Sequence, residues 1–199
     1  MKRFTFEQSD DEFYTSHSGL ALVGLCINRY SGLPLQISKK MKGNDVVSHT
    51  DIVRSFLGLL CLGKSDYEAI SAMRNDTYFR QSLGIKNVPS AERLRQRLDE
   101  HAESLERLPS GKFATNSLIM SLAGLAYNIL RFIGQLGLLG DRSPVRHSAK
   151  RRRIRTVIQE LMYRAARLIE TGRKLKLRFS RHCCAFDSFQ AVYNRLAFG

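Results

Sequence analysis

The stretch SLIMSLAGLAYNIL, at residues 117–130, is the longest apolar segment of this 199-residue chain. Its large apolar side chains recur at spacings of three and four, as on one face of an α-helix. The repeat runs through Leu118, Leu122, Leu125, Ile129 and Phe132. We therefore predict a long helix over about residues 114–133, ended by Gly134 and the glycine-rich stretch 137–140. Because Arg131 interrupts the stretch before the ~20 residues that a membrane span requires, we expect a buried core helix.

The rest of the chain shows shorter helical and strand patterns. Apolar spacing and capping residues predict helices at residues 19–30, after Ser48 or Thr50 up to Gly63, after Ser65, after Ser90, at 157–169 and at 186–196. Alternation of apolar and charged residues predicts a short strand or hairpin within residues 1–16 and a strand at 174–179. The expected fold class is mainly α with a few short strands.

The charge of the chain is strongly positive and unevenly placed. The net charge is +14 and the isoelectric point is about 10.1. Residues 1–104 hold 14 Lys and Arg against 13 Asp and Glu, whereas residues 105–199 hold 18 against 5, a net charge of +13. Such a half requires a polyanionic partner, and DNA, RNA or an anionic membrane would each meet that requirement.

Cysteine usage and the start of the chain indicate a reducing, cytoplasmic location. Cys26 and Cys61 each stand alone in an apolar segment, where a thiol acts as a small core residue. Cys183 and Cys184 are adjacent and lack the C-x(2–4)-C pairs of structural zinc sites. Acidic residues within 7–12 interrupt any apolar region of an export signal. A soluble protein without a structural metal is therefore expected.

Two helices after Ser65 and Ser90 form the most informative pattern of the first half. A Ser-x-x-Glu capping box occupies residues 65–68, and Ser90 starts the second helix. The second helix carries Arg93, Arg95 and Arg97. This arrangement resembles a helix-turn-helix module, in which the second helix enters the major groove. An ordinary antiparallel helix pair with solvated arginines fits equally well, because the linker 83–89 is longer than the usual tight turn.

The second half contains a concentrated basic run within a linker-like segment at residues 140–153. The run comprises Lys150, Arg151, Arg152 and Arg153, with Arg155 beyond it. Four consecutive cations repel one another, so the run is either a solvated tail or a phosphate clamp. Its position within the basic half favours phosphate contact. These five residues, together with the three arginines at 93–97, are the predicted DNA-binding residues.

Four stretches resemble bacterial insertion-sequence transposases of the DDE type. These are SAERLRQRL (90–98), LERLPSGKFATN (105–116), LAYNILRFIGQ (125–135) and RIRTVIQEL (153–161). The first is similar to the N-terminal portion of that family, and the other three are similar to its C-terminal portion. The resemblance covers most of the chain.

The resemblance also implies that a catalytic core is missing. Transposases of this type carry a ribonuclease-H-like core, with two catalytic aspartates and a glutamate that use Mg²⁺, between the two portions that are present here. In this chain the N-terminal pattern joins the C-terminal one near residues 104–105. The resemblance thus implies an N-terminal helical region at 1–104 with a helix-turn-helix-like segment, and a basic C-terminal region at 105–199. The fold would be a transposase remnant whose ribonuclease-H-like core is largely absent.

The positions of the remaining carboxylates also argue against a catalytic metal site. Two-metal phosphoryl transfer requires several carboxylates that converge on ions ~3.5–4 Å apart. Residues 105–199 offer only Glu106, Asp141, Glu160, Glu170 and Asp187, scattered along the chain. We therefore expect no catalytic residues and no bound cofactor in this chain.

Three functional hypotheses follow from these patterns. The leading one is a shortened, nucleoid-associated transposase that binds double-stranded DNA at the element's terminal inverted repeats and interferes with the full-length transposase. The second is a non-functional, poorly folded fragment, since removal of a sheet core would leave apolar faces without partners. The third is a metal-dependent nuclease built from the remaining carboxylates, which their scattered positions disfavour.

Overall fold

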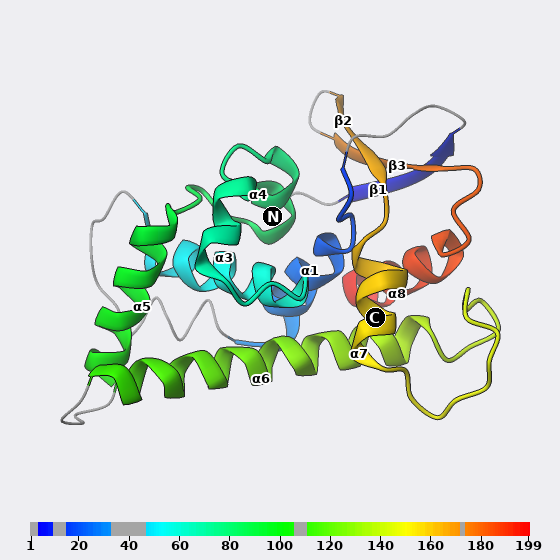
Figure 1. The fold of residues 1–199 in the computed structure, drawn as a ribbon. Coiled ribbons are helices and arrows are strands. Elements are labelled where there is room, and N and C mark those ends of the chain that lie inside the picture. Colours follow the sequence, from blue (N-terminus) through cyan, green and yellow to red (C-terminus); the bar gives the residue numbers. More distant parts are fainter. Residues whose placement is uncertain (1–3, 10–14, 33–46, 106–110, 172–173) are drawn as a thin grey trace.

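The computed structural model describes residues 4–9, 15–32, 47–105, 111–171 and 174–199 (Figure 1). The elements are β1 (Phe4–Ser9), α1 (Leu20–Tyr30), α3 (His49–Cys61), the 3-10 helix η1 (Tyr67–Met73), α4 (Thr77–Leu83), α5 (Ala91–Leu105), α6 (Gly111–Gly137), α7 (Ile154–Val157), the π-helical turn η2 (Ile158–Met162), β2 (Ala166–Thr171), β3 (Lys174–Ser180) and α8 (Phe186–Phe198). Helices predominate and the strands form one small sheet, which confirms the mainly α class with a few short strands.

Local capping explains where several helices begin. The hydroxyl of Ser48 accepts a hydrogen bond of 3.1 Å from the backbone N–H of Asp51, and α3 follows. In the same way, the hydroxyl of Ser90 accepts a hydrogen bond of 3.2 Å from the N–H of Arg93, and α5 follows. Each hydroxyl satisfies an N–H group that the first helical turn leaves without a partner. The predicted helix starts at these two serines are confirmed.

Two predicted helices are wrong in detail. The capping box at residues 65–68 does not form, since Asp66 rather than Ser65 accepts the N–H of Glu68, and the segment is the short 3-10 helix η1. The helix expected at 157–169 ends at η2, and residues from Ala166 onward form β2. Antiparallel pairing with β3 supplies the backbone hydrogen bonds of this strand, so its tertiary partner overrides the local helical spacing.

The sheet joins the first and the last parts of the chain. Its strand order is β1-β3-β2, with β1 parallel and β2 antiparallel to β3. The ring of Phe6 in β1 lies 4.3 Å from the ring of Tyr193 in α8, edge to face. The Tyr193 hydroxyl also accepts a hydrogen bond of 2.8 Å from the N–H of Phe4. Residues from both sequence regions, 1–104 and 105–199, therefore contribute to one apolar core.

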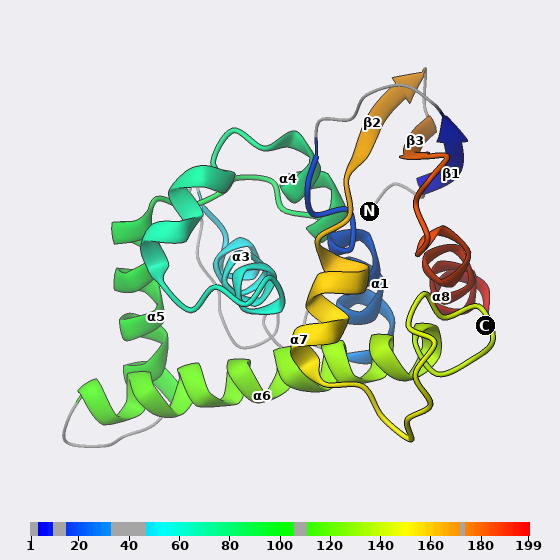
Figure 2. The same cartoon turned by 45° about the vertical axis from the view of Figure 1, so that its right-hand side comes forward.

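The long helix α6 runs beneath the other helices (Figure 2). It contacts α5 and α3 toward one end and α1, α7 and α8 toward the other. One face is buried and includes Leu122, Ala126 and Ile133, but Met120 is 73% exposed and Tyr127 is 51% exposed. The prediction of a buried helix therefore holds for one face only. Among the described residues, Thr115–Gly137 is the helix long and apolar enough to cross a membrane by length and composition, and here a third of its apolar window is buried.

Gly19 precedes α1 and lies directly against the backbone of η2. Its N–H donates a hydrogen bond of 3.1 Å to the carbonyl of Met162, and the N–H of Ser18 donates one of 3.1 Å to the carbonyl of Arg164. A Cβ at position 19 would overlap the carbonyl oxygen of Leu161 and the Cα of Met162. The absence of a side chain is what lets the start of α1 approach η2 this closely.

His17 and Asp76 form a polar pair that ties the segment before α1 to the start of α4. The Nε2 atom of His17 lies 2.8 Å from Oδ2 of Asp76. The Oδ1 atom of Asp76 accepts a hydrogen bond of 2.9 Å from the N–H of Phe79, which caps α4. Burial raises the pKa of Asp76, but the hydrogen bonds from His17 and Phe79 outweigh burial, so the pKa lies below its ordinary value. The folded chain thus favours the ionised carboxylate.

Replacing Asp76 by Ala is expected to lower the free energy of unfolding by about 2 kcal/mol at pH 7, because the N-terminal cap of α4 and the carboxylate partner of His17 are both lost. Asp76→Asn keeps a cap acceptor and should lose about 1 kcal/mol. A lowered carboxyl pKa stabilises the fold above the unfolded value of about 3.9, and this effect is lost as the pH falls through the folded pKa. The deficit of Asp76→Asn should therefore shrink below pH ~4. Urea unfolding at pH 7 and pH 3 measures it, and an equal deficit at both pH values would contradict the ionic contribution.

Candidate nucleic-acid interface

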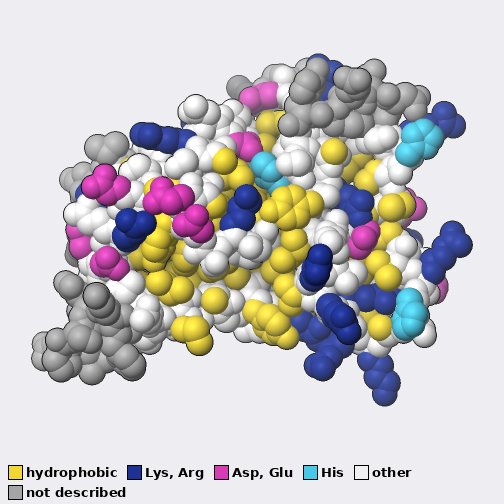
Figure 3. All heavy atoms as spheres, in the orientation of Figure 1, with side chains coloured by type: hydrophobic (Ala, Val, Ile, Leu, Met, Phe, Trp, Pro, Cys, Tyr) yellow, Lys and Arg dark blue, Asp and Glu magenta, His cyan; other side chains and the backbone are white. Residues whose placement is uncertain are grey.

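The three arginines of α5 have polar partners within the protein. Arg93 donates to Gln96 at 3.2 Å, Arg95 to Glu68 at 3.2 Å and Arg97 to Glu100 at 2.8 Å. The guanidinium of Arg95 also lies over the ring of Tyr67, 5.5 Å from its centre. The Arg95–Glu68 pair is exposed and contributes little to stability, whereas the Arg97 side chain is only 13% exposed. A phosphate would have to displace these partners in order to bind. Acidic side chains also gather at this end of the molecule, at the left of Figure 3.

The surroundings of α5 differ from those of a helix-turn-helix module. Leu94 and Leu98 are fully buried, and α5 packs mainly against α6, η1 and α3. The helix expected to precede it is replaced by η1 and α4, which are joined by a turn. α5 is thus a packed helix whose three arginines have polar partners within the protein.

The strongest concentration of positive charge lies in residues 138–155, which we call the basic loop; it comprises the segment between α6 and α7 and the first two residues of α7. It contains seven Lys and Arg residues and one Asp. The six exposed cations are Arg142, Arg146, Lys150, Arg151, Arg153 and Arg155. Among the residues that the structure describes, none of these six has an ion pair with a carboxylate. Lys and Arg side chains gather in this region at the lower right of Figure 3.

Arg152 differs from its neighbours because its guanidinium contacts the protein. Its Nε donates a hydrogen bond of 2.8 Å to the carbonyl of Leu138, and its Nη2 donates one of 2.8 Å to the carbonyl of Val145. Its own carbonyl accepts a hydrogen bond of 3.0 Å from Arg131 of α6. Four of the five predicted phosphate ligands of this run are thus exposed, and the fifth is engaged in shaping the loop.

Sequence reasoning did not include two exposed cations of the basic loop, Arg142 and Arg146. Residues 140–153 look like an ordinary linker in the sequence, and single arginines in a linker carry no signal of their own. These two arginines belong to the same surface as the later run only because the loop folds back, with the carbonyls of Leu138 and Val145 both bound to the guanidinium of Arg152.

The outer face of the sheet is a second basic area, but it contains its own counter-ion. Lys174, Lys176 and Arg178 alternate along β3 on the side opposite its buried residues. Glu7 of β1 lies 2.6 Å from Nε of Arg178 and 3.7 Å from Nζ of Lys176. Pairing with Glu7 reduces the attraction of this face for a polyanion, so the basic loop is the better candidate.

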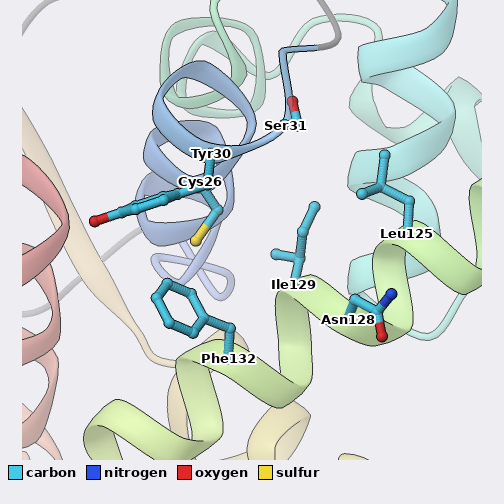
Figure 4. Close-up of a pocket in the computed structure, with 7 residues that line it drawn as sticks. All are labelled: Cys26, Tyr30, Ser31, Leu125, Asn128, Ile129 and Phe132. Carbon is cyan, nitrogen blue, oxygen red and sulfur yellow. The ribbon is translucent and has the colours of Figure 1, made fainter.

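A pocket of about 250 Å³ lies between α1 and α6 (Figure 4). It is lined by Cys26, Tyr30, Ser31, Leu125, Asn128, Ile129 and Phe132. The rings of Tyr30 and Phe132 lie 5.3 Å apart, edge to face. Burial raises the pKa of the Cys26 thiol to about 12, so this thiol is not a nucleophile at neutral pH. The lining is mainly apolar, and its other polar groups are the hydroxyls of Tyr30 and Ser31 and the amide of Asn128.

Among the described residues, no group of three or more His, Cys, Asp or Glu side chains lies close enough together to hold a metal ion. Among the described carboxylates of the second half, Glu160 is paired with Arg164 in its own segment. Glu106 lies outside the described residues. No protein-family model, curated protein or solved structure matches this chain.

Proposed function

We propose that this chain binds double-stranded DNA through the phosphates of its backbone, with the basic loop as the contact surface. One observation carries the proposal: six exposed cations lie in the basic loop, five of them before α7 and Arg155 in its first turn, without a carboxylate partner among the described residues. Arginine guanidinium groups donate paired hydrogen bonds that match phosphate oxygens. DNA presents one negative charge per ~1.7 Å of helix axis, so several cations of one loop can be neutralised at once.

The biological setting that we propose is that of a DDE-type transposase without strand-transfer chemistry. The resemblance of residues 90–98, 105–116, 125–135 and 153–161 supports it, and the scattered carboxylates of the second half agree with it. The DNA partner would then be the terminal inverted repeats of an insertion element, and the chain would act on the bacterial nucleoid. Occupied element ends would be closed to the full-length transposase, so transposition should fall when the two proteins are co-expressed.

Equilibrium binding over a salt series tests the proposed function. The wild-type chain should bind a duplex with a log–log salt slope of up to about −5, because each phosphate contact contributes about −0.9. A duplex that carries the terminal repeat, a scrambled duplex and anionic vesicles should be compared at each salt concentration. Binding to neither duplex, or tighter binding to the vesicles, would contradict the proposal. A preference for the terminal repeat that persists at high salt would identify the element's ends as the target.

A second candidate, the poorly folded fragment, is favoured by the exposed apolar side chains of α6. Met120 and Tyr127 lie on its outward face, where a missing domain would leave an uncovered surface. The apolar core with contributions from both halves favours the folded alternative instead. A single cooperative thermal transition at low and high protein concentration would support the folded protein, whereas broad unfolding with aggregation would support the fragment.

A further inference from the structure

We infer that Arg152 is a positioning residue, whose guanidinium fixes the shape of the basic loop so that its exposed cations are held ready for phosphate. The inference deepens the proposed function and rests on it. The run Lys150–Arg153 is then not a uniform cationic tail. Arg151 and Arg153 are exposed, and Arg152 between them contacts the backbone of the loop.

One planar group closes the loop at two points. The carbonyl of Leu138 stands at the start of the loop and that of Val145 near its middle, and both accept hydrogen bonds of 2.8 Å from Arg152. Leu138 is fully buried and its N–H donates a hydrogen bond of 3.0 Å to Gly134 of α6. The guanidinium therefore connects the loop to Leu138, which is fixed by its burial in the core and by its hydrogen bond to α6.

Further hydrogen bonds tie the same loop to two helices. Arg131 of α6 donates to the carbonyl of Arg152 at 3.0 Å. Ser188 of α8 donates its hydroxyl hydrogen to the carbonyl of Arg142. Each bond joins a loop carbonyl to an element of the core, so the segments that carry Arg142 and the later cations have defined places.

A fixed loop matters because its cations repel one another. A free loop with six like charges would spread them apart, and ordering it on DNA would cost conformational entropy. Holding the loop in advance removes that cost from the binding step. The two carbonyls accept hydrogen bonds from the Arg152 guanidinium, so its charged N–H groups have acceptors although the side chain faces inward. Arg152 thus acts on phosphate through Arg151, Arg153 and Arg142 rather than by direct contact.

The substitution Arg152→Lys separates shape from charge. Lysine keeps the positive charge but lacks the rigid planar fork, so it cannot reproduce both bonds. We expect Arg152→Lys to bind a duplex about tenfold more weakly than wild type at ~0.1 M salt, with a salt slope shallower by more than one contact. Arg151→Gln is the matched control, and it should lose one contact, a slope change of about 0.9. The second readout is trypsin cleavage after Arg146, which should become about tenfold faster in Arg152→Lys and stay unchanged in Arg151→Gln.

The outcomes are distinct. Wild-type affinity and wild-type cleavage in Arg152→Lys would overturn the inference, and so would faster cleavage with unchanged salt slope, because Arg152 would then be structural only. If the wild-type chain binds no duplex, the proposed function fails, and the cleavage rates report separately on whether Arg152 holds the loop. Should Arg152→Lys fail to fold, Ser188→Ala removes another tie and keeps every charge. It should weaken binding a few-fold, and wild-type binding would count against a preformed loop.

Discussion

Replacing Arg151, Arg153 and Arg155 together by Gln is expected to weaken duplex binding by about a hundredfold at ~0.1 M salt. Each exposed guanidinium that leaves a phosphate removes about 0.9 from the log–log slope, so the slope should become shallower by about 2.7. These side chains have no carboxylate partner among the described residues, so folding stability should change by less than about 0.5 kcal/mol. Fluorescence anisotropy over a salt series, with thermal unfolding alongside, measures both quantities.

The chain contains its own matched control for this experiment. Arg93, Arg95 and Arg97 have the same residue type and the same spacing, and the same triple change to Gln removes the same net charge. Since these arginines are paired within the protein, their replacement should weaken binding by only a few-fold. Equal losses in the two triple variants would mean that net charge alone governs binding and that the basic loop has no special role. A larger loss in the α5 variant would favour the helix-turn-helix hypothesis.

Replacing Gly19 by Ala is expected to destabilise the fold by about 3 kcal/mol, which corresponds to a fall in Tm of about 10 °C for a chain of this size. The added methyl group would overlap backbone atoms of Leu161 and Met162, and backbone cannot rotate out of the way as a side chain can. The hydrogen bond from Gly19 to Met162 would be stretched at the same time. Thermal and urea unfolding measure the loss.

Gly124→Ala makes the same chemical change in an open place. No heavy atom of the described residues lies within 4 Å of the position that its Cβ would occupy, and the residue is inside α6. Alanine is the better helix former, so this variant should gain about 0.5–1 kcal/mol. Similar effects at the two glycines would contradict the close contact between α1 and η2.

Sequence patterns predicted those elements whose cause is local. Helix starts at Ser48 and Ser90 depend on a hydroxyl and an N–H a few residues away, and both could be read from the chain. The strand at Lys174–Ser180 follows from alternation, because one of its faces is buried. The segment from Ala166 could not be assigned in this way, since its strand conformation depends on pairing with β3. The 3-10 form of η1 likewise gave no distinct periodic signal.

For the candidate site, the sequence predicted where positive charge accumulates but not which of the cationic side chains are exposed. The run at 150–153 identifies where charge accumulates, but consecutive arginines are indistinguishable until the fold shows which one faces its own backbone. The α5 arginines illustrate the converse, because Glu68 lies far from Arg95 in sequence and no local pattern reveals their contact. Charge counts therefore located the region, and tertiary contacts separated the exposed cations from the engaged ones.

The parallel pairing of β1 with β3 also has a consequence for the order in which the protein can fold during synthesis. Phe4 pairs with Leu175, so β1 leaves the ribosome long before its neighbouring strand exists. At ordinary translation rates that interval is on the order of 10 s. During it, Phe6 lacks the ring of Tyr193, and the N–H of Phe4 lacks the Tyr193 hydroxyl. The first strand therefore stays without its partner strand until β3 has been made, and an unpaired strand is a site of aggregation.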